Sequence, residues 1–172
     1  MEKFSSSRRD FLRTTGVVAT SVILPRQVMA TLAKIKKPIK LGMITDLHQD
    51  VMHDGPARLK AFLDAMKEEK PDALLQLGDF AYPTKKNEAV TKAFEKAHSR
   101  TLNVLGNHEI DGGHTFDAVA KLWGMKGRYY TENINGLDLI VLDCNEKPKN
   151  HKGGYPAHIG EQQLDWLEKQ LK

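Results

Sequence analysis

Short apolar runs alternate with longer stretches of helical periodicity, and this alternation restricts the fold more than any other feature of the sequence. The runs cover residues 39–45, 73–77 and 101–105, and helical stretches begin near Pro56 and Glu88. Short apolar segments separated by amphipathic helices are typical of βαβ units with a largely parallel sheet. The sequence therefore predicts an α/β fold.

The rest of the chain predicts a hairpin and two further helices. Residues 129–133 and 137–143 flank the turn Ile134-Asn135-Gly136, which favours antiparallel pairing. Helices are expected over 116–122 and 161–171. Apolar side chains at helical spacing are expected to face inward from the two earlier helices, and these are Leu59, Phe62, Leu63, Met66, Ala89, Ala93, Phe94 and Ala97.

Size and charge exclude several classes of protein. The 172 residues are 40% hydrophobic and 28% charged, which is ordinary for one globular domain and unlike disordered, collagenous or coiled-coil chains. The formal charge is +4, but residues 1–30 hold five basic and two acidic residues, leaving 21 basic and 20 acidic residues elsewhere. A nearly neutral body with its excess cations in the tail does not predict a nucleic-acid groove.

The first 30 residues have the organisation of an export signal. Arg8 and Arg9 come first, a short apolar stretch follows over residues 16–24, and small residues stand at the outer positions of Val28-Met29-Ala30. Paired arginines before such a stretch indicate a twin-arginine signal, and the stretch is too short to cross a bilayer of roughly 30 Å. A basic amphipathic surface helix is the alternative. We expect a mature protein that begins near Thr31, has no membrane span, and is periplasmic or extracellular after export by the twin-arginine machinery.

Cys144 is the single cysteine, so an intramolecular disulfide is excluded. Cys144 closely follows the apolar run 137–143, which predicts that the thiol is buried and structural rather than a reactive nucleophile.

Metal-ligand residue types follow each of the three predicted parallel strands. Asp46 and His48 follow the first strand, Asp79 follows the second, and Asn107 and His108 follow the third. Ligands of open α/β sheets collect at the carboxyl ends of the strands, so these side chains are expected to meet. Carboxylate, amide and imidazole groups suit Fe, Mn or Zn. The sequence therefore predicts a metal site at this edge.

The three blocks of residues resemble those of calcineurin-like metallophosphoesterases. The blocks are Asp46-Leu47-His48, Gly78-Asp79 and Gly106-Asn107-His108-Glu109, in the family's order, and the likeness extends over about residues 40–171. The resemblance implies an αββα sandwich that hydrolyses phosphate monoesters or diesters. Its metals would be two divalent or trivalent ions.

Residue roles follow from the same resemblance. Asp46 and His48 would bind the first metal, Asp79 would bridge both and act in catalysis, and Asn107 would bind the second. His108 would act as the general acid beside the leaving group. Two cations about 3.5 to 4 Å apart can generate a bridging hydroxide near neutral pH and stabilise both the attacking and the leaving oxygen.

Two departures from the family pattern leave alternatives open. Tyr82 follows Asp79 by three residues, as the ligating tyrosine does in purple acid phosphatases, so Tyr82 is either a ligand or a packed or substrate-facing aromatic. Family members also continue with a further strand and a Gly-His-x-His block that completes both metal sites. We therefore expect residues 31–172 to form an incomplete domain, the parallel βαβ half plus a hairpin of the second sheet.

Four further histidines lack the strand-end position of ligands and are expected to be solvated or near the substrate. They are His53, His114, His151 and His158.

The sequence leaves two main functions open. The chain is either a metal-dependent phosphoesterase, or its N-terminal portion, or it is a non-catalytic remnant or binding domain with a partial metal site. An exported ligand-binding protein without a metal is a further alternative, but such a protein does not need the Asp-x-His and Gly-Asn-His-Glu blocks.

Overall fold

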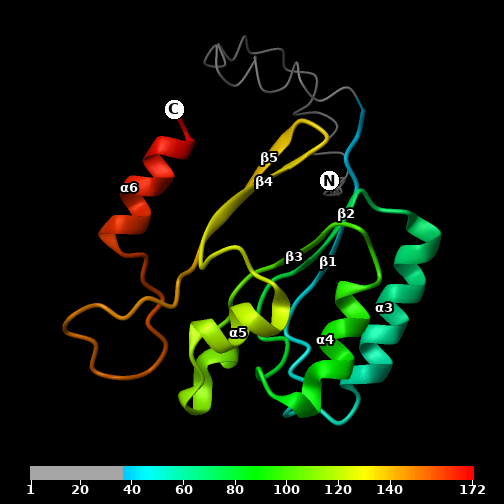
Figure 1. Cartoon of the computed structure of the whole chain (residues 1–172), viewed down its shortest axis with the longest axis horizontal. Helices are drawn as coiled ribbons and strands as arrows, with labels where there is room; N and C mark the ends of the chain where they lie inside the picture. Colours follow the sequence, from blue (N-terminus) through cyan, green and yellow to red (C-terminus); the bar gives the residue numbers. More distant parts are fainter. Residues whose placement is uncertain (1–36) are drawn as a thin grey trace, which may run out of the picture. The chain divides into compact units, whose positions relative to one another are not determined.

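The computed structural model describes residues 37–172, and its centre is a parallel sheet with strand order β1-β2-β3 (Figure 1). The strands are β1 (Leu41–Ile44), β2 (Ala73–Gln76) and β3 (Thr101–Asn103). The crossover helices are α3 (Gly55–Glu69) and α4 (Glu88–Glu95). The predicted α/β fold is confirmed. Each of these predicted strands begins and ends within two residues of its observed bounds.

Alternating side chains of the parallel strands enter two different clusters. Leu74 packs with Leu59 of α3 and Phe94 of α4, on the helix-covered face of the sheet. Leu75, its neighbour along β2, packs instead with Leu102 and Ile134. Successive side chains of a strand point to opposite faces, so β2 is buried on both sides. The sheet is therefore held rigidly, and the loops at its carboxyl edge start from fixed positions.

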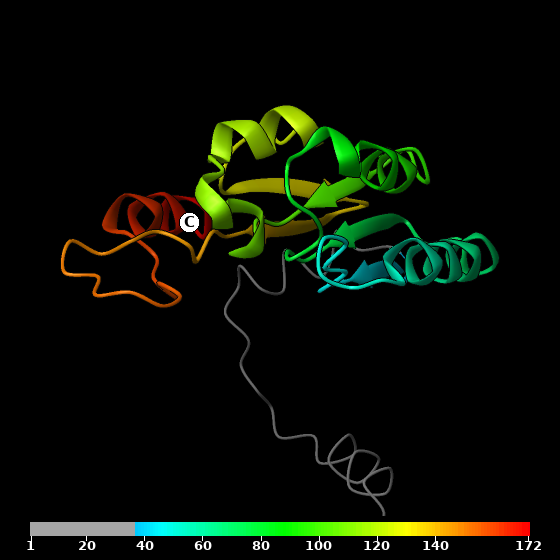
Figure 2. The same cartoon turned by 90° about the horizontal axis from the view of Figure 1, so that it is seen from below.

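The hairpin β4 (Tyr130–Ile134) and β5 (Leu137–Val141) forms a separate antiparallel sheet. Asn135 and Gly136 connect the strands with φ angles of 52° and 96°, the left-handed pair that a two-residue hairpin turn requires. The hydroxyl of Tyr130 donates to the carbonyl of Asn103 at 2.8 Å, which ties the hairpin to β3. The turned view in Figure 2 shows the hairpin alongside the parallel strands.

Four further segments complete the described chain. They are the helices α5 (Phe116–Trp123) and α6 (Glu161–Gln170) and the short 3₁₀ segments η1 (Lys85–Asn87) and η2 (His108–Gly113). Thr115 caps α5 by accepting the N–H of Ala118 at 3.3 Å.

The predicted inward face of α4 is only partly right. Phe94 is buried, but Ala89, Ala93 and Ala97 are exposed. These three alanines line a groove between α3 and α4 instead of touching the core. The 3.6-residue period finds the apolar face of a helix but not how closely the next helix approaches it.

The predicted burial of Cys144 is wrong, because its side chain is exposed. Strand β5 ends at Val141, three residues earlier, so Cys144 lies in the following loop. There its carbonyl accepts the N–H of His158 at 2.8 Å.

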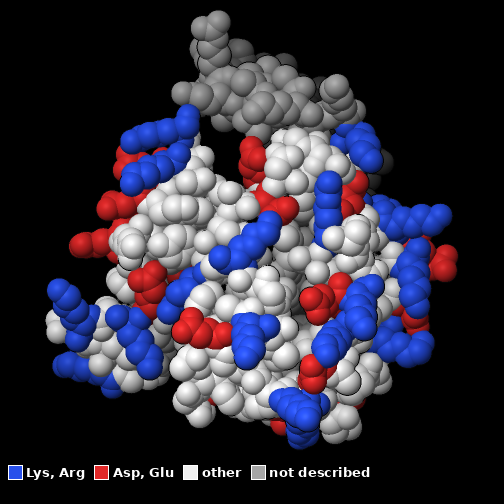
Figure 3. All heavy atoms as spheres, viewed as in Figure 1, with Lys and Arg blue, Asp and Glu red and all other residues white. Residues whose placement is uncertain are grey.

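Basic and acidic side chains are interspersed on the face drawn in Figure 3. No helix within residues 37–172 is both long and apolar enough to cross a bilayer. The proposed signal over residues 1–30 lies outside the described residues.

Candidate metal centre

Asp46, His48 and Asp79 meet at the carboxyl edge of the parallel sheet, as the sequence predicts. Each offers one ligand atom, and these atoms all lie within 4.8 Å of one another. His48 Nε2 is 3.6 Å from Asp46 Oδ1 and 3.7 Å from Asp79 Oδ2. Two carboxylates and one imidazole suit Fe, Mn or Zn.

All three cluster residues have left-handed backbone conformations. Their φ angles are 53° for Asp46, 47° for His48 and 53° for Asp79. Non-glycine residues rarely adopt this region, at a cost on the order of 1 kcal/mol each, and such strain concentrates at functional sites. The loops therefore keep a strained backbone conformation at the three residues whose ligand atoms converge.

The loop after β1 is held against the loop after β2 by backbone hydrogen bonds. Asp46 N–H donates to the carbonyl of Gly78 at 3.2 Å, and His48 N–H donates to the carbonyl of Asp79 at 2.9 Å. Arg58 of α3 supports the first loop from the other side, since its guanidinium donates to the carbonyls of Asp46 and Leu47. The cluster is thus set by main-chain pairing rather than by side-chain contacts alone.

Glu109 connects the loops after β2 and β3. Its carboxylate is fully buried and accepts the N–H groups of Asp79 at 3.0 Å and Gly106 at 2.8 Å, besides those of Phe80 and Ala81. Burial raises the pKa of this carboxyl to about 7, although the backbone donors oppose the shift. Glu109 therefore fixes the backbone of Asp79 from inside the protein.

Gly106 is required by the close approach of these two loops. A Cβ atom at this position would collide with the Asp79 carboxylate and backbone N, and would lie 2.7 Å from Glu109 Oε2. Glycine at this position therefore permits the close contact between the two loops.

His108 and Asn107 begin the segment after β3. The N–H of His108 donates to Asp79 Oδ1 at 2.9 Å, so this segment is joined directly to the cluster. The His108 ring stacks on Tyr82 with centroids 4.2 Å apart and meets His48 edge-on at 4.7 Å. Asn107 is adjacent in the chain, and its role as a ligand of a second metal stays a prediction.

Tyr82 is placed as a packed aromatic beside the site. Besides stacking on His108, it lies 5.2 Å from the ring of His114. These contacts agree with the alternative that Tyr82 is a packed or substrate-facing residue, and its role as a ligand stays a prediction.

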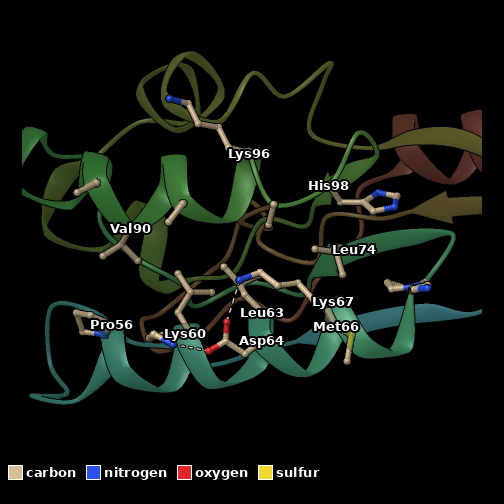
Figure 4. A pocket seen from close by; sticks show the side chains of 16 residues that line it. Pro56, Lys60, Leu63, Asp64, Met66, Lys67, Leu74, Val90, Lys96 and His98 are labelled. Atoms are coloured by element: carbon tan, nitrogen blue, oxygen red, sulfur yellow. Dashed lines mark hydrogen bonds and ion pairs between the residues drawn. The ribbon is translucent and has the colours of Figure 1, made fainter.

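A cavity lies away from the cluster, in the groove between α3 and α4 (Figure 4). Its volume is about 840 Å³, and it shares no residue with the cluster. Apolar side chains such as Leu63 and Val90 line it, while Lys60 and Lys67 both pair with Asp64 of the same helix. The ligand cluster, and not this groove, is therefore the candidate site of chemistry.

Comparison with known protein families identifies the chain. The model of the calcineurin-like phosphoesterase family matches residues 39–171, and this range includes the whole cluster. The chain belongs to the calcineurin-like phosphoesterase family. The curated proteins contain no match to it. This membership confirms the predicted metallophosphoesterase-like architecture, seen here as a parallel half with a hairpin.

The family is one of metal-dependent phosphoester hydrolases, and the donor set of this chain fits a metal ion. Three ligand groups converge, and Gly106 leaves room for Asp79 where any side chain would collide. Asp46 is 58% exposed while Asp79 is 19% exposed, so the cluster opens to solvent on the Asp46 side. A phosphoester could approach from there.

Asp50 and Arg58 are two residues near the site that the sequence did not reveal. Asp50 is four residues after Asp46, and its carboxylate lies 3.9 Å from the ring of His108. The only signal in the sequence is its nearness to the Asp-x-His block. Arg58 carries no signal, because its contact with the loop depends on how α3 docks.

Proposed function

We propose that this protein hydrolyses phosphate monoesters or diesters with metal ions held at the Asp46, His48 and Asp79 cluster. The observation that carries the proposal is the convergence of these ligands within 4.8 Å in a chain of the calcineurin-like family. Bound cations would supply electrostatic stabilisation of the transferring phosphoryl group and a water-derived nucleophile at neutral pH.

The chain's own residues have distinct tasks in this proposal. Asp46 and His48 would hold one cation, Asn107 would hold the second, and Asp79, in the loop after β2, would contribute to both. His108 is within 4.7 Å of the His48 ring and gives a proton to the departing oxygen. The Glu109 carboxylate keeps the Asp79 loop in place by accepting the backbone N–H of Asp79.

The test measures metal content and hydrolysis of aryl phosphate monoesters and diesters by the full chain, before and after exhaustive chelation. Asp79→Asn should lower hydrolysis by at least about 100-fold, because a bridging ligand loses its charge. Asp64→Asn, an exposed carboxylate change on α3, should leave both measurements unchanged. Undiminished turnover after chelation would refute the proposal. Metal uptake without hydrolysis would favour the non-catalytic binding domain.

His108→Asn tests the general acid separately. Hydrolysis of esters with poor leaving groups should fall more than that of esters with good ones, because only a basic departing oxygen needs a proton. Metal content should stay the same. Equal losses across the leaving-group series would remove His108 from this role.

We also propose that the tail over residues 1–30 directs export by the twin-arginine route, which its adjacent arginines and short apolar stretch support. Replacing both Arg8 and Arg9 with Lys should retain the precursor in the cytoplasm on fractionation. Normal export of the double-lysine form would indicate the general secretory route.

A further inference from the structure

The ring of His108 is almost completely enclosed, but one of its nitrogens has no partner. The side chain is 8% exposed and lies between the stacked ring of Tyr82 and the edge of His48. Within the described chain, Nε2 is buried without a hydrogen bond. A buried polar atom without a partner destabilises the fold, so a group that can satisfy this nitrogen is expected nearby.

The nearest such group is the carboxylate of Asp50, whose Oδ2 lies 3.9 Å from His108 Nε2. This distance exceeds that of a hydrogen bond, so the two groups must approach more closely to form one. Catalytic hydrogen bonds are often long before substrate binds and shorten in the complex. Asp50 is itself only 10% exposed, so water competes weakly for its carboxylate.

Two other contacts fix the carboxylate of Asp50 in this direction. Oδ2 accepts the N–H of Tyr82 at 2.6 Å, and Oδ1 accepts Nδ2 of Asn87 at 2.7 Å. A carboxylate has about four acceptor positions, so Oδ2 can take one more donor. The backbone N–H of Tyr82 thus anchors the carboxylate while the ring of Tyr82 holds His108.

We propose that Asp50 is a positioning residue for His108, and this inference rests on the proposed function. The Asp50 carboxylate accepts the Nε2–H of the imidazole, which leaves Nδ1 to give its proton to the leaving oxygen. In that step the Nδ1–H bond breaks, its electron pair stays on Nδ1, and the neutral ring keeps its Nε2–H on Asp50. In this proposal Asp50 acts on the reaction only through His108.

The first experiment observes the ring directly by NMR and needs no turnover. The full chain is labelled with ¹⁵N in histidine, and the His108 signals are assigned by their loss in His108→Asn. The native protein should show a ring N–H proton of His108 that is shifted downfield and protected from exchange. Asp50→Asn should abolish this resonance. Persistence of the resonance in folded Asp50→Asn would overturn the inference.

Matched variants separate pairing from charge and from stability. Asp54→Asn removes a carboxylate of the same loop that pairs with Arg58, and it should keep the resonance. Asn87→Ala removes one anchor of Asp50 but no carboxylate, and it should lower the melting temperature while keeping the resonance. If Asp50→Asn does not fold, Asp50→Ser replaces it, because a hydroxyl can still accept the Tyr82 N–H.

The second experiment uses hydrolysis. Asp50→Asn should lower kcat for poor leaving groups about 10-fold more than for good ones, with metal content unchanged, since proton donation alone is impaired. A uniform loss across the series would overturn the positioning role. A chain that hydrolyses no ester but shows the Asp50-dependent resonance would refute the proposed function while supporting the pairing. The two proposals therefore fail in different ways.

Discussion

Glu109 and Asp143 are both fully buried carboxylates, one at the carboxyl edge of the parallel sheet and the other just beyond the hairpin. Asp143 is paired with a cation, because Arg128 Nε donates to its Oδ2 at 2.6 Å, and the Asn145 N–H donates to its Oδ1 at 2.8 Å. Glu109 accepts only backbone N–H groups, and no salt bridge to it occurs among residues 37–172.

The two regions differ in how their buried carboxylate is compensated. The hairpin region carries its own positive charge, so its buried carboxylate is a structural element. At the sheet edge, the Glu109 carboxylate has no cationic partner among residues 37–172, and burial raises its pKa to about 7. Such an edge gains from an added cation, which is the situation of a metal site.

The largest expected effect comes from removing the cation of the hairpin region. Arg128→Leu leaves Asp143 buried and uncompensated, which should lower the free energy of unfolding by about 3 kcal/mol or more. Metal content should not change. Chemical denaturation measures the loss, and Lys126→Leu, which breaks the exposed pair with Glu132, should cost below about 0.5 kcal/mol. Equal losses for the two variants would contradict the comparison.

The pH dependence of stability tests the comparison at Glu109, on the sheet edge. The pKa of Glu109 rises from 4.5 to about 7 on folding, so the folded protein holds a proton that the unfolded chain releases. The stability of the metal-free protein should therefore fall between about pH 4.5 and 7, by up to about 3 kcal/mol. Denaturation across this range measures the slope.

Glu109→Gln should remove that slope, because no proton is released on unfolding, whereas the exposed Glu95→Gln should leave it intact. A slope that survives in Glu109→Gln would assign the pH dependence to other groups.

Gly106→Ala should perturb the sheet edge by crowding. The added methyl group collides with the Asp79 carboxylate and backbone, so unfolding should become easier by about 2 kcal/mol and metal affinity should fall. Gly127→Ala is the control, since its Cβ would meet only the Tyr129 carbonyl, at 3.3 Å. Isothermal titration with Mn²⁺ or Zn²⁺ measures the affinity. Unchanged metal binding in Gly106→Ala would show that the close approach is unimportant for the site.

The smallest effect is expected at Cys144, in the loop after the hairpin. Cys144→Ser should change the free energy of unfolding by less than about 0.5 kcal/mol, because the side chain is exposed. The native thiol should react with an alkylating reagent without denaturant. A thiol that reacts only after unfolding would restore the buried position predicted from the sequence.

The elements were predictable because their signals are local. The short apolar runs at 73–77 and 101–105, the Asn135-Gly136 turn and the helical spacing near Pro56 are signals that act over a few residues. The ligand residues Asp46, His48 and Asp79 were also predictable, because parallel strands bring their carboxyl ends to one edge.

Burial and pairing beyond those elements were not predictable in the same way. Ala93 was expected in the core but faces a groove, since the distance between α3 and α4 is set by larger side chains around it. Cys144 follows a buried strand yet lies in an exposed loop, because β5 ends earlier than its apolar run.

The sequence by itself determined the order of strands and helices, the edge at which the ligands meet and the family to which the chain belongs. These follow from residue types and short spacings. Only the tertiary structure decided that Glu109 is buried against the N–H groups of Asp79 and Gly106 and that Asp50 faces His108. The contacts of Glu109 with Asp79 and of Asp50 with His108 join residues 30 and 58 positions apart, and they depend on how the loops pack once the sheet has formed.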